Sequence, residues 1–464
     1  MVLDTILAIN WPSVGLKAAQ LILSLSILVI LHEFGHYITA KWFKCRVEKF
    51  YLFFDPWFSI FKKKVGETEY GIGWLPLGGY VKISGMIDES MDKEQMKQPP
   101  QPWEFRSKPA WQRLIIMLGG VTVNILLAFV IYAGILMVWG QDKIPNQSLK
   151  NGIWVTDSLM YEIGLRDGDK IVSVNNDSIK NYEDAPKKIL FSGGGNIDVV
   201  RNGKDTLIVI PRSLIGQLIE KKKKKGRLFL PRVPAIIGEF DQKDSSIAKK
   251  SGLKYWDKIV KVDSVDVNYF DQVTAYMDSK KNQKVELTVL RNGQNILIPI
   301  VPDSDGKFGP PFLTNAQYDS LGVLKVIHTD YNFFSAFPAG FHLAITSLKE
   351  YIEQFKLIFS PSTGAYKGVG GFKTMGSIFS GNGWDWESFW NITALFSVIL
   401  AFMNLLPIPA LDGGHVLFTL IEMITGRKPS EKFLEYAQIV GIVILLALMI
   451  YANGNDWLGW GRGK

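Results

Sequence analysis

Four long apolar stretches constrain the fold of this chain more than any other feature of its 464 residues. Each is close to the roughly 20 apolar residues that a helix needs to cross a bilayer. Because lipid offers no hydrogen-bond partners, a spanning segment must pair its own backbone groups, which favours helices. The stretches cover residues 16–40, 114–139, 389–406 and 433–451, and the third is short if it stops at Pro407. We expect a polytopic α-helical membrane protein with four transmembrane helices.

The first stretch carries ionisable residues in the order His32-Glu33-Phe34-Gly35-His36. Helix positions i and i+4 share one face, so the two histidines can bind one metal ion while Glu33 reaches a water held there. In soluble proteins this pattern is typical of zinc metalloproteases. An ionisable side chain inside a span costs about 2.5–3.5 kcal/mol on insertion scales, so three of them call for a partner such as a metal. The alternative is a chance match, which would more often fall on a solvated helix.

A catalytic zinc site usually has three protein ligands, and the end of the third stretch offers a further one. Pro407 and Pro409 break the helix at membrane depth, where irregular backbone is tolerated only against protein or a watery cavity. Asp412 follows the break, and we expect it to be the third ligand. His415 is an alternative or additional contributor, and Asp412 could instead cap a helix that begins near Val416.

Basic residues indicate the orientation of the spans. They are concentrated in residues 41–49 and 106–113, between the first two stretches, and in residues 427–432, between the last two. The positive-inside rule therefore places residues 41–113 and 409–432 in the cytoplasm and residues 140–388 outside, although Arg462 and Lys464 weakly oppose this. Both termini are then outside, and the histidine pair lies in the cytoplasmic half of the first span. We also expect residues 1–40 to remain in the mature protein, because they lack the features of a cleaved signal peptide.

The large segment between the second and third stretches contains an internal repeat. Residues 164–175 recur as residues 252–263, and residues 199–203 recur as residues 289–293, about ninety residues further on in both cases. Each copy predicts a strand, a helix and then a hairpin that turns at Asn-Gly. We therefore expect two α+β domains, at residues 140–220 and 226–305. The predicted strands are residues 170–174 and 258–262, and the predicted helices are residues 182–190 and 270–279.

Residues 47–84 alternate apolar and polar side chains over short runs, which predicts a small antiparallel sheet on the cytoplasmic side. An edge strand close to the metal could pair with an extended substrate peptide. The glycines of Gly71-Ile72-Gly73 would let such a strand approach closely.

Three further features have no role in the predicted metal site. Residues 333–359 predict one or two amphipathic helices at the membrane interface, with His342 in a structural or interfacial role. The run Lys221–Lys225 predicts a solvated linker and no nucleic-acid site, because no aromatic residues are interleaved with it. Cys45 is the only cysteine, which excludes a disulfide framework and a thiolate metal site.

The two metal-binding segments together resemble the site-2 protease family of intramembrane zinc metalloproteases. The first has His-Glu-x-x-His at residues 32–36, and the second has Asn-x-x-Pro-x-x-x-Leu-Asp-Gly at residues 404–413. The repeats resemble PDZ domains of bacterial proteases, with their Gly-Leu-x-x-Gly-Asp-x-Ile pattern. In the second copy Trp256 replaces a glycine, so its local turn should differ. The four-span layout with a tandem insert is similar to the regulator-of-sigma-E branch of the family.

This resemblance implies a Zn²⁺ cofactor held by His32, His36 and Asp412, with Glu33 as the catalytic residue. It also implies that Asn404 and Pro407 bind substrate, and that residues 71–73 belong to a loop beside the active site. Asn404 could instead make a hydrogen bond between helices. The implied substrates are single-span membrane proteins, such as anti-sigma factors or signal-peptide remnants, in a bacterial inner membrane. The PDZ-like domains would screen or bind the outer parts of these substrates.

Two other functions fit parts of the sequence. The chain could be a membrane-anchored PDZ scaffold or chaperone with an inactive metal site, but all four catalytic positions are present. A metal transporter would need more polar residues in the second and fourth spans. The expected organisation is a first span at 1–40, a sheet-bearing loop at 41–113, a second span at 114–139, the two domains, amphipathic helices and linker at 306–388, a third span at 389–408, a metal-ligand loop at 409–432, a fourth span at 433–452 and a tail at 453–464.

Overall fold

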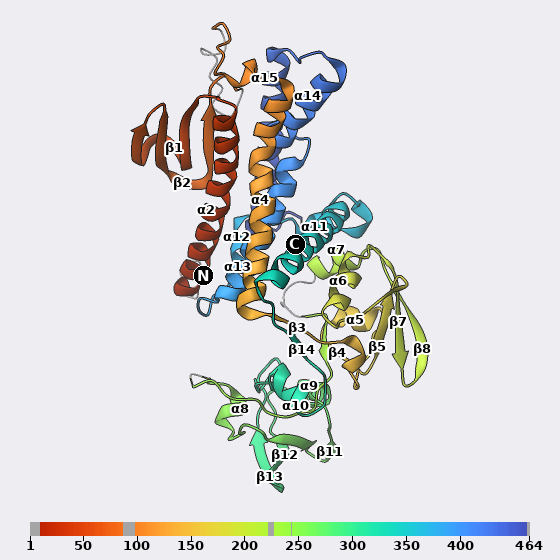
Figure 1. Cartoon of the computed structure of the whole chain (residues 1–464). Coiled ribbons are helices and arrows are strands. Elements are labelled where there is room, and N and C mark those ends of the chain that lie inside the picture. Colours follow the sequence, from red (N-terminus) through yellow and green to blue (C-terminus); the bar gives the residue numbers. More distant parts are fainter. Residues whose placement is uncertain (1–9, 87–97, 221–226, 243, 462–464) are drawn as a thin grey trace. The chain divides into compact units, whose positions relative to one another are not determined.

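A computed structural model describes residues 10–86, 98–220, 227–242 and 244–461 (Figure 1). The predicted linker Lys221–Lys225 and the basic residues Arg462 and Lys464 lie outside these ranges. The chain divides into two compact units, which we describe separately. Unit 1 comprises the chain up to residue 140 together with residues 330–356 and everything from residue 368 onward. Unit 2 comprises residues 141–329 and 357–367.

Unit 1 contains four described helices that are long and apolar enough to cross a membrane. They coincide with the four predicted spans, which confirms that part of the fold prediction. The third ends at Leu405, and Leu406 is extended, because the residue before a proline is disfavoured in a helix. The fourth extends beyond the predicted span into the expected tail. The helices are α2 (Trp11–Trp42), α4 (Ala110–Trp139), α13 (Trp386–Leu405) and α15 (Glu431–Leu458).

Two shorter helices of unit 1 contact this bundle. Helix α14 (Asp412–Thr425) occupies most of the segment that we expected to be a loop, and it begins at Asp412 and not near Val416. Helix α12 (Phe372–Ser377) is anchored on α15, because the carboxylate of Asp456 accepts hydrogen bonds from the backbone of Gly371 and Thr374.

The predicted amphipathic segment is one helix, α11 (Phe333–Ile358). Ala336, Gly340 and Ala344 are its buried residues, and the backbone of Gly340 lies against that of Ala133 on α4. Small residues spaced by four allow two helices to approach closely, as in many membrane helix pairs. His342 lies on the exposed side of this helix.

The predicted sheet of unit 1 is built from two long antiparallel strands, β1 (Val47–Val65) and β2 (Thr68–Ile83), which fold back on one another. Residues 49–52 of β1 pair with residues 69–72 on one side and with residues 79–82 on the other. Residues 59–65 pair with the outer side of residues 68–73. The segment at residues 79–83 therefore forms one edge of the sheet.

Our prediction that Gly71-Ile72-Gly73 forms an edge strand is wrong. Gly71 pairs with Tyr51 and with Lys62, and Ile72 pairs with Leu52 and with Phe61, so these two residues lie inside the sheet; Gly73 pairs with Ser59. The glycines serve close packing within the sheet, because a Cβ on Gly71 would collide with the ring of Tyr51 and one on Gly73 with the backbone of Phe54. The glycines correctly predicted that another group comes close to this strand, but that group is a neighbouring part of the sheet and not the substrate.

Unit 2 contains two four-stranded sheets with the same strand order, β6-β5-β7-β8 and β11-β10-β12-β13. In each sheet an arginine bonds an aspartate from another part of the copy. Arg201 at the end of β7 bonds Asp169, which precedes β5, and Arg291 at the end of β12 bonds Asp257, which precedes β10. The predicted strands and helices all occur within about two residues of their expected ends. The elements are β5 (Lys170–Val174), β6 (Asp177–Ser178), α6 (Asp184–Phe191), β7 (Gly195–Arg201) and β8 (Lys204–Ile210), then β10 (Lys258–Val262), β11 (Val265–Asp266), α9 (Phe270–Ser279), β12 (Val285–Arg291) and β13 (Gln294–Ile300).

The turn at Trp256 did not change as we expected. Trp256 has φ +69°, and its counterpart Gly168 has φ +90°, so the second copy keeps a left-handed backbone that a tryptophan rarely adopts.

The remaining α-helices and strands of unit 2 are α5 (Ser158–Glu162), α7 (Leu214–Glu220), α8 (Ile247–Lys250), α10 (Asn315–Ser320), β3 (Gln141–Lys143), β4 (Ile153–Val155), β9 (Phe229–Pro231) and β14 (Ile327–Thr329).

Candidate metal centre

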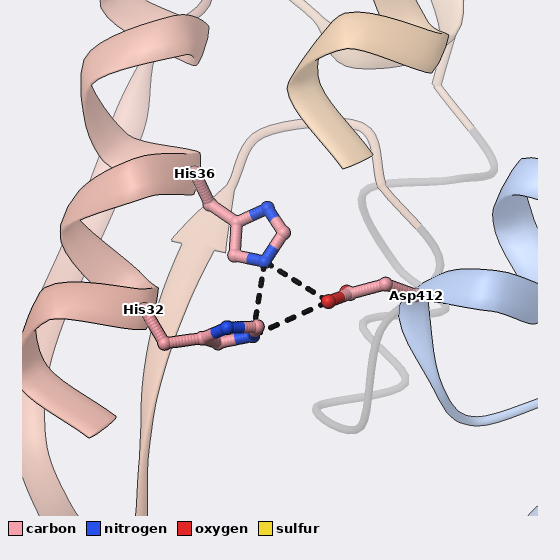
Figure 2. A group of neighbouring side chains, drawn as sticks. All are labelled: His32, His36 and Asp412. Atoms are coloured by element: carbon pink, nitrogen blue, oxygen red, sulfur yellow. Dashed lines mark hydrogen bonds and ion pairs between the residues drawn. The ribbon is translucent and has the colours of Figure 1, made fainter. Parts of the chain in front are cut away.

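Three ligand atoms converge in unit 1 (Figure 2). The Nε2 atoms of His32 and His36 lie 3.3 Å apart, and each lies 3.2 Å from Oδ2 of Asp412. Ligands at the usual 2.0–2.1 Å from a tetrahedral zinc ion are separated by about 3.3 Å. Both imidazoles are buried, so water does not compete for these atoms from most directions. The donor set and its spacing therefore fit a zinc ion.

The local structure explains how the ligands reach this arrangement. Helix α2 presents both histidines from one face, as their spacing predicts. Asp412 is the first residue of α14, and no side chain caps that helix end. Its carboxylate faces the histidines and not the helix terminus, so the alternative of a capping residue is not observed. Gly413 permits the tight turn before it, because a Cβ there would collide with the backbone of Leu405 and Leu406.

Two glycines of α4 that the sequence analysis did not single out lie against α2: Gly120 against the imidazoles and Gly119 against the backbone of Gly35. A Cβ on Gly120 would lie 2.6 Å from Cε1 and 2.8 Å from Nδ1 of His32, and it would also collide with Nε2 of His36. A Cβ on Gly119 would lie 2.9 Å from the carbonyl carbon of Gly35 on α2. The pair Gly119-Gly120 in the middle of an apolar span was the available signal, since such pairs mark close helix contacts.

Glu33 lies in the wall of a cavity of about 620 Å³ that also contains the ligands. Residues 79–83, in the edge strand of the sheet, also line this cavity. A Cβ on Gly79 would lie 3.6 Å from Cγ of Glu33, and the backbone of Val81 donates a hydrogen bond to the Glu33 carboxylate. The general-base candidate is thus held beside the edge strand of the sheet.

The remaining predicted site residues are distributed unequally. Nδ2 of Asn404 lies 3.2 Å from Nε2 of His32, at the ligand group. His415 lines the cavity but is not a member of the ligand group, and Pro407 is exposed on the loop that precedes Asp412. Residues 71–73 are absent from the described cavity wall.

A residue of α15 that the sequence analysis missed supports the Asp412 loop. Oε1 of Gln438 accepts a hydrogen bond of 3.1 Å from the backbone of Ala410, whose φ is +79°. Gln438 is 5% exposed and lines the cavity. Its polar side chain in an apolar span was the signal that could have identified it.

Comparison with known proteins agrees with this geometry. The model of peptidase family M50 matches residues 20–448. Proteins from Rickettsia conorii and Vibrio cholerae are both 28% identical to this chain over 94% of its length, covering 96% and 97% of their own. A protein from Campylobacter jejuni is 26% identical over 98% of this chain and 96% of its own length. All three are named as a "putative zinc metalloprotease".

The family match extends from the first predicted span to the fourth, and it includes all three metal-ligand candidates. The fold, the donor set and the relatives lead to the same conclusion. The chain belongs to peptidase family M50, the site-2 protease family, and it is a zinc metalloprotease.

Proposed function

We propose that this protease hydrolyses peptide bonds within the transmembrane segments of single-span membrane proteins. The observation that carries the proposal is the position of the ligand group. His32 and His36 lie on α2, a helix long and apolar enough to cross a bilayer, and Asp412 follows shortly after α13, a second such helix. His32, His36 and Asp412 would hold a zinc ion, which would supply an activated water and Lewis-acid polarisation of the scissile carbonyl.

Glu33 and Asn404 have distinct roles in this proposal. The Glu33 carboxylate takes a proton from the attacking water and passes it to the nitrogen of the leaving amine. Asn404 lies at Nε2 of His32, an atom whose lone pair a metal ligand must commit. Once that lone pair binds the metal, the amide of Asn404 is free to bond a peptide group of the substrate. The exposed Pro407 lies three residues further along the chain.

The edge strand supplies what an unwound substrate needs. A peptide bond in a transmembrane helix is already hydrogen-bonded within that helix, so it must be exposed before it can be cleaved. An extended substrate can replace the lost hydrogen bonds by pairing with residues 79–83, whose outer side lies at the cavity. This assigns to residues 79–83 the role that we predicted for residues 71–73.

The two copies in unit 2 support a further part of the proposal. We take them as PDZ-like domains outside the cytoplasm of a bacterium, whose inner membrane holds the four spans. The hydroxyl of Tyr269 in the second copy donates a 3.2 Å hydrogen bond to Oδ1 of Asn151 in the first. The copies therefore form a joined pair that would screen out substrates with bulky outer domains. Anti-sigma factors and signal-peptide remnants, once shortened, are substrates of this kind.

Cleavage in proteoliposomes tests the proposal. We expect wild-type protein to cleave a single-span substrate that lacks its outer domain, and to cleave the intact substrate at least tenfold more slowly. Glu33→Gln should abolish cleavage while retaining bound zinc, because it removes the base and keeps all three ligands. If Glu33→Gln cleaves at the wild-type rate, the chemistry proposed here is wrong. If neither the wild-type protein nor the Glu33→Gln variant cleaves the substrate but both stabilise it, the chain is a scaffold.

A further inference from the structure

The sides of the two imidazoles that face away from Asp412 have different partners. Nδ1 of His36 lies 2.8 Å from the backbone carbonyl oxygen of Ile116 on α4. A carbonyl oxygen can only accept, so this contact places the proton of the neutral ring on Nδ1. The lone pair of Nε2 is then directed at the ligand group.

Nδ1 of His32 meets a side chain instead. It lies 3.1 Å from the amide of Asn124, also on α4, and Asn124 is fully buried. The amide presents Nδ2 to the ring, and its Oδ1 has no hydrogen-bond partner. The backbone of Asn124 is also fixed, because its main-chain carbonyl oxygen accepts a 2.7 Å hydrogen bond from the hydroxyl of Ser397 on α13.

The orientation of this amide determines which tautomer His32 adopts. With Nδ2 facing the ring, Nδ1 must accept, so the proton of the neutral ring is on Nε2 and blocks that atom as a ligand. With Oδ1 facing the ring, Nδ1 donates and the lone pair of Nε2 is free. Only the second orientation is compatible with a metal at the site, and it matches the contact that His36 makes with Ile116.

We infer that Asn124 is a positioning residue, whose Oδ1 accepts a hydrogen bond from Nδ1–H of His32 whenever the metal is bound. The inference rests on the metal site of the proposed function and adds a residue that acts through His32. Partners that fix the tautomer and direction of a histidine ligand typically change metal affinity about 10- to 100-fold. Asn124 reaches the site from a different helix, so it also links the position of α4 to that of the ligands.

Metal affinity, and not activity, provides the test. The full chain carrying Glu33→Gln, in detergent, is titrated with Co²⁺ against a chelator, and the Co²⁺ absorption spectrum is recorded. Asn124→Leu, which has a similar volume and no acceptor, should bind Co²⁺ roughly 10- to 100-fold more weakly. Asn124→Ala, which leaves a cavity and no clash, should show the same loss if the leucine variant does not fold. Asn124→Asp retains an acceptor and should restore affinity to within a few-fold of the parent.

A matched control separates this role from helix packing. Thr393→Val removes a buried 3.0 Å hydrogen bond between α13 and Ser24 of α2 without touching either histidine, and it should leave affinity and spectrum unchanged. Parent-like affinity in Asn124→Leu and Asn124→Ala overturns the inference. So does an Asp variant as weak as the Leu variant, or an equal loss in Thr393→Val. If the parent itself binds no Co²⁺, the metal site of the proposed function fails as well.

Discussion

Replacement of Gly120 by alanine is the sharpest test of the metal centre, because it changes the site without altering a ligand. The added Cβ would lie 2.6 Å from Cε1 of His32 and 2.8 Å from its Nδ1, and it would collide with Nε2 of His36. Carbon atoms in ordinary contact are about 3.5–4.0 Å apart. The rings must therefore move by about 1 Å or α4 must retreat from α2.

The expected loss of metal affinity depends on whether the added methyl group strains the metal-free or the metal-bound state. Without metal, the two imidazoles can rotate away from the methyl group. With metal, their Nε2 atoms must remain 3.2 Å from the Asp412 carboxylate, so the strain falls mainly on the bound state. Overpacking costs about 1–3 kcal/mol, which corresponds to roughly a 5- to 150-fold loss of metal affinity. Peptide hydrolysis should fall by about 100-fold, since a 1 Å misplacement of reacting groups has that order of effect.

The assay is chelator competition for Zn²⁺ on detergent-purified protein, together with cleavage of a single-span substrate. Gly134→Ala is the matched control, because Gly134 lies on the same helix and has no neighbouring atoms within 4 Å of its ideal Cβ position. It should leave affinity and cleavage unchanged. Wild-type affinity in Gly120→Ala, or an equal loss in Gly134→Ala, would refute the close approach of α4 to the ligands.

Three further outcomes are expected. Removal of metal by a chelator should stop cleavage, and added Zn²⁺ should restore it; cleavage that persists in metal-free protein contradicts the zinc assignment. Gln438→Leu leaves the backbone of Ala410 unpaired at a cost of about 1–3 kcal/mol, so metal affinity should fall while Gln438→Glu and the exposed-site control Val440→Leu retain it. Chelator competition checks this, and a loss in Val440→Leu would contradict it. Gly71→Ala should expose the β1/β2 sheet to limited proteolysis, because its methyl group meets the ring of Tyr51, but should leave metal affinity unchanged. Reduced metal affinity in that variant would show that residues 71–73 do contact the site.

Several features were predictable because they depend on neighbouring residues in the chain. The length and composition of the apolar stretches specify the four helices, and the i, i+4 spacing places His32 and His36 on one face. Asn202 and Asn292, each followed by glycine, turn the hairpins with positive φ in both copies of unit 2. The break after Leu405 follows from the prolines that come next.

What the sequence alone determined is therefore the periodicity, the end of α13 before Pro407 and the pair of ligands on one helix, since each of these is a property of local backbone geometry. Only the tertiary structure decided that Gly120 and Asn124 meet the histidines, and that Gln438 holds the Asp412 loop. It also decided that residues 79–83, and not residues 71–73, form the strand edge at the cavity. Strand pairing and helix contacts join residues far apart in the chain, and many pairings satisfy the same local pattern. Packing of the whole unit selects one of them.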